Sequence, residues 1–184
     1  MPTMVRPFQP DDAPEVAALF AAYMAEALGG ASVMTPELLA AECGRRFELT
    51  LATDGPVVGF AAWRDTYDLH HAVSGGEVID FFVAPSHRGC GLAVQLVAAV
   101  AAVVRARGGA FLYSMVLQDD PARLKLARRW GVGFAGEHTY LAQQVFERMA
   151  DWGGRTPARA VLRDLLALQP WTSQAAQAEQ GTDL

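Results

Sequence analysis

The segment from Glu77 to Ala93 constrains the fold most, because a strand, a glycine-containing turn and a helix follow one another there without a gap. Residues 77–84 are a nearly unbroken run of β-forming residues that ends at Pro85. Residues 91–107 are almost wholly apolar and end at Gly108-Gly109, which is typical of a buried helix. This apolar run is too short to span a bilayer and is flanked by arginines.

The turn between this strand and helix predicts an anion site. The first turn of a helix leaves backbone N–H groups without partners, and a Ser, Thr, Asp or Asn side chain usually caps them. From Arg88 to Val94 there is no such residue and no acid. Gly89 and Gly91 allow a close approach of the backbone to a ligand, and Arg88 adds a positive charge. These features predict a site for phosphate or pyrophosphate at the start of the helix.

Other phosphate-binding motifs fit less well. The chain has no Gly-Lys-Ser/Thr, which excludes a P-loop. Gly89-x-Gly91-x-x-Val94 lacks the third glycine of a dinucleotide fingerprint, and no acidic residue ends the next strand at 110–117. The alternative to a phosphate site is an ordinary glycine-containing turn between a strand and a helix, with no ligand.

The rest of the chain predicts a mixed α/β sheet rather than a doubly wound one, with an antiparallel hairpin leading into a β-α-β unit. Asp11 and Asp12 are expected to cap the first helix, and Asp54-Gly55 predicts the turn of a hairpin. We expect a first domain over 1–142, a helical extension over 143–170 and a loose polar tail over 171–184. The expected strands are 4–8, 47–53, 57–63 with a continuation to about 69, 77–84, 110–117 and 134–141. The expected helices are 13–28, 35–45, 91–107, 119–131, 143–151 and 157–168, and 70–76 is expected to be a loop.

Composition narrows the class of protein. With 184 residues, 52% hydrophobic and 19% charged, the chain can bury a core without metals or disulfides. Its 15 basic and 20 acidic residues give a net charge of −5, which disfavours nucleic acid and suits a cationic partner. Cys43 and Cys90 are too few for a disulfide framework or a four-ligand zinc site, and Asp68-x-His70-His71 lacks further ligands, so no metal is expected. The first residues show no apolar signal region, which predicts a cytoplasmic protein without a membrane span.

The turn resembles the acetyl-CoA motif Arg/Gln-x-x-Gly-x-Gly/Ala of the GNAT superfamily of N-acetyltransferases, which it matches as Arg88-Gly89-Cys90-Gly91-Leu92-Ala93. The resemblance extends over most of Val5–Leu141. It includes the opening Arg6-Pro7 with Asp12, the strand Val58–Ala61 and the stretch Trp130–Phe134. Asp80-Phe81-Phe82-Val83, followed by Arg-Gly-x-Gly, most resembles the diamine and polyamine (spermidine/spermine) acetyltransferases.

The resemblance implies a mostly antiparallel sheet in which strand 77–84 splays from its parallel neighbour 110–117. The pantetheine arm of acetyl-CoA would lie in the gap and pair with the backbone near Phe82 and Val83. The pyrophosphate would rest on the amides of Gly89, Cys90, Gly91, Leu92 and Ala93. The acetyl group would pass directly to an amine through a tetrahedral intermediate, without a metal. Asp119 or Asp120 stands where the family has an asparagine that touches pantetheine.

Asp80 is the candidate general base, because a carboxylate alone in an apolar strand is costly unless it is paired or used. A purely structural role, capping a loop or binding a buried arginine, is the alternative. Ile79 stands where the polyamine enzymes often have glutamate, and strand alternation would place Glu77 on the face opposite Asp80. The family's usual acid, a tyrosine, is missing from Leu124–Trp130. Tyr113 and Tyr140 are the candidate substitutes, or simply strand aromatics.

The sequence therefore predicts an acetyl-CoA-dependent N-acetyltransferase for a small cationic amine, such as a polyamine, a diamine or an amino-acid-like molecule. There are two rival hypotheses. One is a module that binds acyl-CoA with little catalysis, and the other is an acetyltransferase that acts on protein or peptide amines. Two apolar stripes follow the main domain, and they predict packing on the domain itself or across a homodimer. Their residues are Val145, Phe146, Met149 and Trp152 in the first stripe, and Val161, Leu162, Leu165 and Leu166 in the second.

Overall fold

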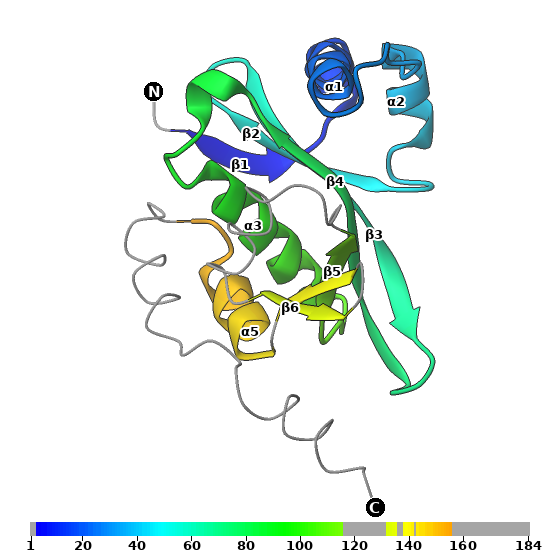
Figure 1. Ribbon diagram of the computed structural model, residues 1–184, viewed down its shortest axis with the longest axis vertical. Coiled ribbons are helices and arrows are strands. Elements are labelled where there is room, and N and C mark those ends of the chain that lie inside the picture. Colours follow the sequence, from blue (N-terminus) through cyan, green and yellow to red (C-terminus); the bar gives the residue numbers. More distant parts are fainter. Residues whose placement is uncertain (1–2, 116–131, 136–137, 142, 156–184) are drawn as a thin grey trace, which may run out of the picture.

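The computed structural model describes residues 3–115, 132–135, 138–141 and 143–155 (Figure 1). The described strands are β1 (Met4–Pro7), β2 (Glu48–Thr53), β3 (Val57–Asp68), β4 (Val73–Val83), β5 (Leu112–Met115), β6 (Val132–Ala135) and β7 (His138–Leu141). The described helices are α1 (Ala13–Leu28), α2 (Pro36–Glu42), α3 (Leu92–Ala106) and α5 (Gln143–Trp152), with short 3-10 turns η1 (Pro10–Asp12) and η2 (Pro85–His87).

The strands form one mixed sheet in the order β1-β2-β3-β4-β5-β7-β6. Within the described residues every neighbouring pair is antiparallel except β4 and β5, which are parallel. This parallel ladder joins only Gly76–Val78 to Leu112–Ser114, while β4 continues to Val83. Within the described residues the ladder therefore ends at Val78 and Ser114, and the predicted, mostly antiparallel sheet with a central parallel pair is confirmed.

Helices cover both faces of the sheet, with α1 and α2 on one side and α3 and α5 on the other (Figure 1). Strand alternation sends successive side chains to opposite faces, so each strand supplies both cores. On the α1 face Val16, Leu51 and Phe60 are fully buried, and on the α3 face Leu96 and Val100 are. Both faces of β2, β3 and β4 are thereby fixed by packing, which makes the centre of the sheet a firm support for any site on it.

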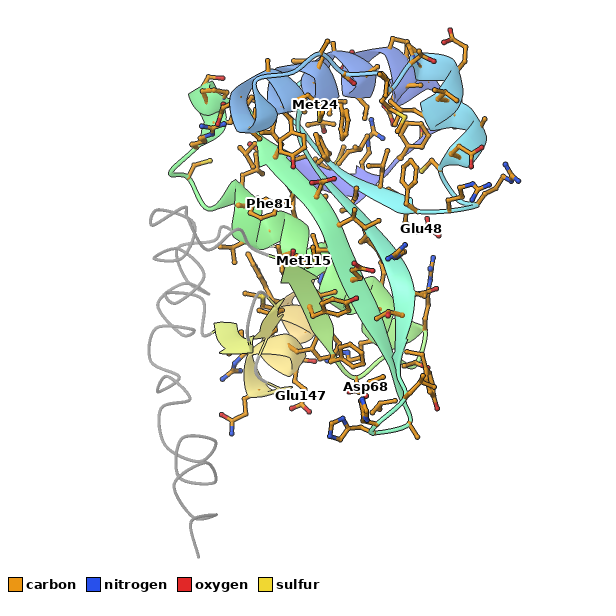
Figure 2. All side chains as sticks on the ribbon, turned by 45° about the vertical axis from the view of Figure 1, so that its right-hand side comes forward. Met24, Glu48, Asp68, Phe81, Met115 and Glu147 are labelled. Atoms are coloured by element: carbon orange, nitrogen blue, oxygen red, sulfur yellow. The ribbon has the colours of Figure 1, made fainter. Side chains whose placement is uncertain are left out.

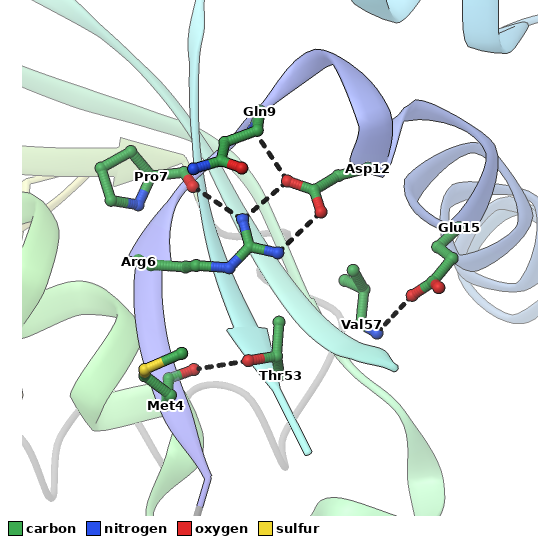
Figure 3. Close-up of polar contacts among 8 residues, drawn as sticks. All are labelled: Met4, Arg6, Pro7, Gln9, Asp12, Glu15, Thr53 and Val57. Atoms are coloured by element: carbon green, nitrogen blue, oxygen red, sulfur yellow. Dashed lines mark hydrogen bonds and ion pairs between the residues drawn. The ribbon is translucent and has the colours of Figure 1, made fainter. Parts of the chain in front are cut away.

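A charge pair joins the first strand to the first helix (Figure 3). The Arg6 guanidinium donates two hydrogen bonds of 2.7 Å to the Asp12 carboxylate, which also accepts the Gln9 amide at 2.7 Å. The expectation that the Asp12 side chain caps α1 is wrong in this respect. Asp12 is the N-cap residue of α1, but its carboxylate is bonded to Arg6 and the turn before the helix, with no side-chain cap bond to α1. The Arg6 hydrogen bond holds the pKa of Asp12 below its usual value.

Besides shifts of one to three residues at other ends, such as α2 ending at Glu42 instead of about 45, two elements differ from the sequence prediction. Residues 73–76, expected to be a loop, are strand, so β3 and β4 form a long hairpin with Asp68 near its tip (Figure 2). The expected strand 134–141 is instead two strands, β6 and β7, which pair antiparallel with each other. The hydrophobic pattern alone did not distinguish an interrupted strand from a continuous one. The expected helices over 119–131 and 157–168 lie outside the described residues.

The first apolar stripe of the predicted extension packs within its own chain. Phe146 and Met149 on α5 are fully buried against the α3 core, and Val145 is buried beside them. Of the two predicted partners for this stripe, the domain itself is the one observed. The second stripe lies outside the described residues.

Candidate active site

The turn before α3 has the features of an anion site. Gly89 and Gly91 both adopt the left-handed conformation, with φ of +79° and +87°, which a side chain would strain. Gly91 is the N-cap of α3, so no side chain caps the helix from that position, and its first turn contains no acidic residue. Leu92 is buried, whereas Gly89 and Cys90 are exposed. The buried leucine anchors the helix, and the loop presents its backbone amides to solvent.

Arg88 faces α1. Its Nε donates to the Val83 carbonyl at 2.9 Å, and its terminal nitrogen donates to Glu26 at 2.8 Å. The guanidinium carbon lies 5.2 Å from the centre of the Phe82 ring. The positive charge expected at the anion site is therefore shared with a carboxylate. The amides at the start of α3 are therefore the candidate anion-binding groups of the loop.

A β-bulge in β4 determines which way Asp80 points. Asp80 lies opposite Ala62 on β3, whereas Val78 lies opposite Trp63, so Ile79 is an extra residue in β4. Glu77 lies opposite Arg64, two residues from Ala62, so Glu77 and Asp80 share the α1 face of the sheet. The expected placement of these two carboxylates on opposite faces is wrong, because simple alternation does not include the bulge.

Asp80 is half-buried beneath α1, and its Oδ1 accepts the Tyr23 hydroxyl at 2.5 Å. Tyr23 comes from the third turn of α1, so the contact joins residues 57 positions apart in the sequence. The buried face of α1 was visible in the helical spacing of its apolar residues. That Tyr23 reaches Asp80 was not, because nothing local signals which strand residue lies under a given turn of helix.

A second polar group lies further along the same face, where β4 and β5 still pair. Glu77 accepts Arg64 Nε at 2.6 Å, and Tyr113 on β5 stands directly beside Glu77. Burial, together with the negative charge of Glu77, raises the pKa of Tyr113, although a hydrogen bond with Thr66 lowers it in part. The Tyr113 phenol therefore keeps its proton at neutral pH.

The gap between β4 and β5 lies beside Asp80. In the part of the chain that the structure describes, the ladder ends with the pair Val78 and Ser114, and Ile79 and Met115 are exposed there. Figure 2 shows Phe81 and Met115 on these neighbouring strands. The Phe82 ring is buried under α1, and the Val83 carbonyl accepts Arg88. The arrangement brings the splayed edge of β4, Asp80 and the glycine turn into one region.

Two predicted site residues receive no test from the structure. Asp120 lies outside the described residues. Tyr140 pairs with Tyr113 through the backbone of β7 and β5, and its side chain lies outside the described part.

Ala93 is half-buried in the first turn of α3, and the Cys90 thiol lies 2.9 Å from the His87 carbonyl. The sequence alone revealed neither the contact of Tyr23 with Asp80 nor that of Glu26 with Arg88.

The histidine pair in the hairpin has a local role. The Asp68 carboxylate accepts the backbone amides of His70 and His71, at 2.8 and 3.2 Å, and contacts His71 Nδ1 at 2.7 Å. Among the described residues no group of three His, Cys, Asp or Glu is placed to hold a metal. In the same part of the chain, no helix has both the length and the apolar character needed to cross a membrane.

The comparisons with known proteins agree with this fold. The sequence pattern of the family described as "Acetyltransferase (GNAT) family" matches residues 14–132, more than half of the chain. No curated protein sequence matches the chain significantly. A ribosomal-protein-alanine N-acetyltransferase from Brucella melitensis biovar Abortus 2308 is similar at 26% identity and a TM-score of 0.57, covering 68% of this chain and 88% of that one.

Two further solved structures show the same fold at lower identity. An N-acetyltransferase from Staphylococcus aureus Mu50 has 16% identity and a TM-score of 0.60, covering 78% of this chain and 99% of that one. The yncA protein of Salmonella typhimurium, solved with its cofactor acetyl-CoA, has 15% identity and a TM-score of 0.58, covering 76% and 91%.

The chain belongs to the GNAT family. It is an N-acetyltransferase of this family that uses acetyl-CoA, and the parting of β4 from β5 beside a glycine turn is the part of the fold that its sequence motif predicted.

Proposed function

We propose that the protein transfers the acetyl group of acetyl-CoA to the amine of a small cationic molecule, with Asp80 as the general base. The observation that carries this proposal is the position of Asp80, half-buried on the α1 face of β4 where the strand leaves β5. An ammonium group must lose a proton before its nitrogen can attack the thioester. A carboxylate beside the gap for the thioester is a suitable acceptor of that proton.

The glycine turn supplies the binding part of the proposal. The amides from Gly89 to Ala93 would bind the pyrophosphate of acetyl-CoA, since they open α3 without a capping side chain or an acid. The pantetheine would lie along the edge of β4 near Phe82 and Val83. A backbone N–H of that edge would then polarise the thioester carbonyl and stabilise the tetrahedral intermediate.

The charges on the α1 face support a cationic acceptor. Asp80 lies on that side, Glu26 and Glu77 there are paired with Arg88 and Arg64, and the chain as a whole carries a net charge of −5. Negative potential around a cleft raises the local concentration of a cation. Polyamines and diamines, the substrates of the enzymes that the strand motif resembles, are therefore the first compounds to test.

Proton return to the CoA thiolate needs a donor that is neutral at working pH. We assign it to Tyr113 or Tyr140, which pair with each other across β5 and β7. The raised pKa of Tyr113 supports its share of this role, because the phenol holds its proton in the range where the enzyme acts. Separate Tyr113→Phe and Tyr140→Phe variants, assayed for CoA release, distinguish the two, and full activity in both would remove tyrosine from this step.

A protein N-terminus is the second candidate acceptor. It is favoured by the 26% identity to a ribosomal-protein-alanine N-acetyltransferase over 68% of the chain. An α-amino group is less basic than a polyamine nitrogen, so it needs less help from a base. The two candidates therefore differ in how strongly they depend on Asp80.

The test is CoA release from acetyl-CoA with a panel of spermidine, short diamines, amino acids and peptides that begin with alanine. We expect turnover with a small cationic amine. Asp80→Asn should lower it by roughly 10²- to 10⁴-fold, while calorimetry shows unchanged binding of CoA. The matched control is Asp65→Asn, an exposed carboxylate that pairs with Arg107.

Each other outcome of this assay selects a different function. Turnover only with peptides would favour the protein acetyltransferase. CoA binding without turnover on any amine would favour the acyl-CoA-binding module. Full activity of Asp80→Asn would give Asp80 a structural role.

The homodimer stays a proposal that rests on the second apolar stripe, Val161 to Leu166, since the first is buried within the chain. Light scattering that finds a monomer at high concentration would refute it. The predicted cytoplasmic location is likewise a proposal, and fractionation of cells that express the chain is the measurement that tests it.

A further inference from the structure

We propose that Tyr23 on α1 is a positioning residue for Asp80. Its hydroxyl donates a hydrogen bond to Oδ1 of the carboxylate at 2.5 Å. A carboxylate offers about four lone-pair sites on two oxygens, so it can accept this bond and still accept an ammonium proton. The tyrosine fixes the direction in which the carboxylate faces the substrate, and it favours the ionised form that acts as a base.

Aromatic packing holds Tyr23 in this position. Its ring contacts Phe20, Phe60 and Phe82, with centroid distances of 5.6, 6.0 and 5.7 Å. Phe60 and Phe82 come from β3 and β4, and both are buried. A ring enclosed on three sides by other rings has little rotational freedom, so the hydroxyl is directed at Asp80 before any substrate binds.

The same helix is anchored at a second point. Glu26 lies one turn after Tyr23 on α1, and it pairs with Arg88 in the motif turn at 2.8 Å. The Arg88 guanidinium in turn lies over Phe82, one of the rings that hold Tyr23. α1 thus contacts Asp80 through Tyr23 and the motif turn through the exposed pair of Glu26 with Arg88.

This inference rests on the proposed function, in which Asp80 is the base. The test is Tyr23→Phe, which removes the hydroxyl and keeps the ring. We expect kcat/KM with the amine substrate to fall by roughly tenfold or more, since a hydrogen bond to a charged group is lost. We also expect the acid limb of the pH–kcat/KM profile to move to higher pH, because the carboxylate loses a donor that favours its ionised form.

Two controls separate positioning from mere packing. Tyr67→Phe removes a hydroxyl from an exposed tyrosine on the hairpin, and it should change neither rate nor profile. In an Asp80→Asn background, Tyr23→Phe should cost little further activity, since the group it serves is gone. A profile that does not move, or losses that multiply in the double variant, would overturn the positioning role even if stability falls.

A separate measurement covers the case in which the proposed function itself fails. The ¹³C carboxyl resonance of Asp80 can be titrated by NMR in the wild type and in Tyr23→Phe without any substrate. A midpoint that rises in the variant supports the contact whether or not turnover is found. An unchanged midpoint refutes it, while turnover by the wild type is judged independently.

Discussion

Replacing Gly91 by alanine should weaken binding of CoA more than it weakens the fold. Gly91 has a φ of +87° at the N-cap of α3, where a Cβ costs about 1–2 kcal/mol. The neighbouring turn is exposed around Gly89 and Cys90, so the free protein can relieve this strain by a local change of backbone. In the proposed site the diphosphate requires the original arrangement of amides, so the strain would have to be restored when CoA binds.

The expected loss of affinity follows from that cost. About 1–2 kcal/mol corresponds to a rise of roughly 5- to 30-fold in the Kd for CoA, measured by titration calorimetry. Unfolding in urea should show a smaller change, because the strain is largely relieved in the free protein.

Gly108 is the matched control at the other end of the same helix. Its φ is +86°, and a Cβ there would meet nothing within 4 Å. With 15 residues, α3 is about 22 Å long, and it separates the two glycines. Gly108→Ala should lower stability by about 1–2 kcal/mol and leave the Kd within about twofold. The reasoning fails if Gly91→Ala binds CoA as the wild type does, or if Gly108→Ala weakens binding equally.

Two further predictions concern the fold. Asp12→Asn should lower the free energy of unfolding by about 1–2 kcal/mol at pH 7, since the half-buried pair with Arg6 is charged on both sides. The pKa of Asp12 is lowered in the folded protein, so this stabilisation is present above the pKa of the unfolded chain and is lost as the pH falls through the folded value. Urea titrations should therefore converge below about pH 4, and a constant difference down to pH 2 would contradict the assignment. Phe146→Ala should cost about 3–5 kcal/mol, as Phe146 is buried in the α3 core. That loss should not depend on protein concentration, and a dependence would place α5 in an interface.

The local sequence pattern was sufficient to predict the elements that carry the candidate cofactor site. The strand, turn and helix from Glu77 to Ala106 are encoded by contiguous residues, and the uncapped start of α3 is visible as the lack of any capping side chain. The helix expected from residue 35 likewise begins there, since Thr35 is the N-cap of α2 and its hydroxyl accepts the Leu38 amide at 3.3 Å. Each of these features depends on neighbours within a few positions.

The position of the carboxylates could not be predicted in the same way. Alternation along β4 placed Glu77 and Asp80 on opposite faces, and the bulge at Ile79 reverses that result. A bulge depends on how two strands are paired, and its sequence signal is weak. The error arose because register is a property of the pair β3–β4 and not of either strand alone.

What the sequence by itself determined is the chemistry available for binding: two glycines in a turn, a helix start without a capping side chain and one carboxylate in an apolar strand. Only the tertiary structure decided which groups meet. Tyr23 reaches Asp80, and Glu26 reaches Arg88, because α1 packs across β3 and β4 on a shared core. Such contacts join residues about 60 positions apart, and they are fixed by the packing of whole faces, for which no local stretch of sequence carries the information.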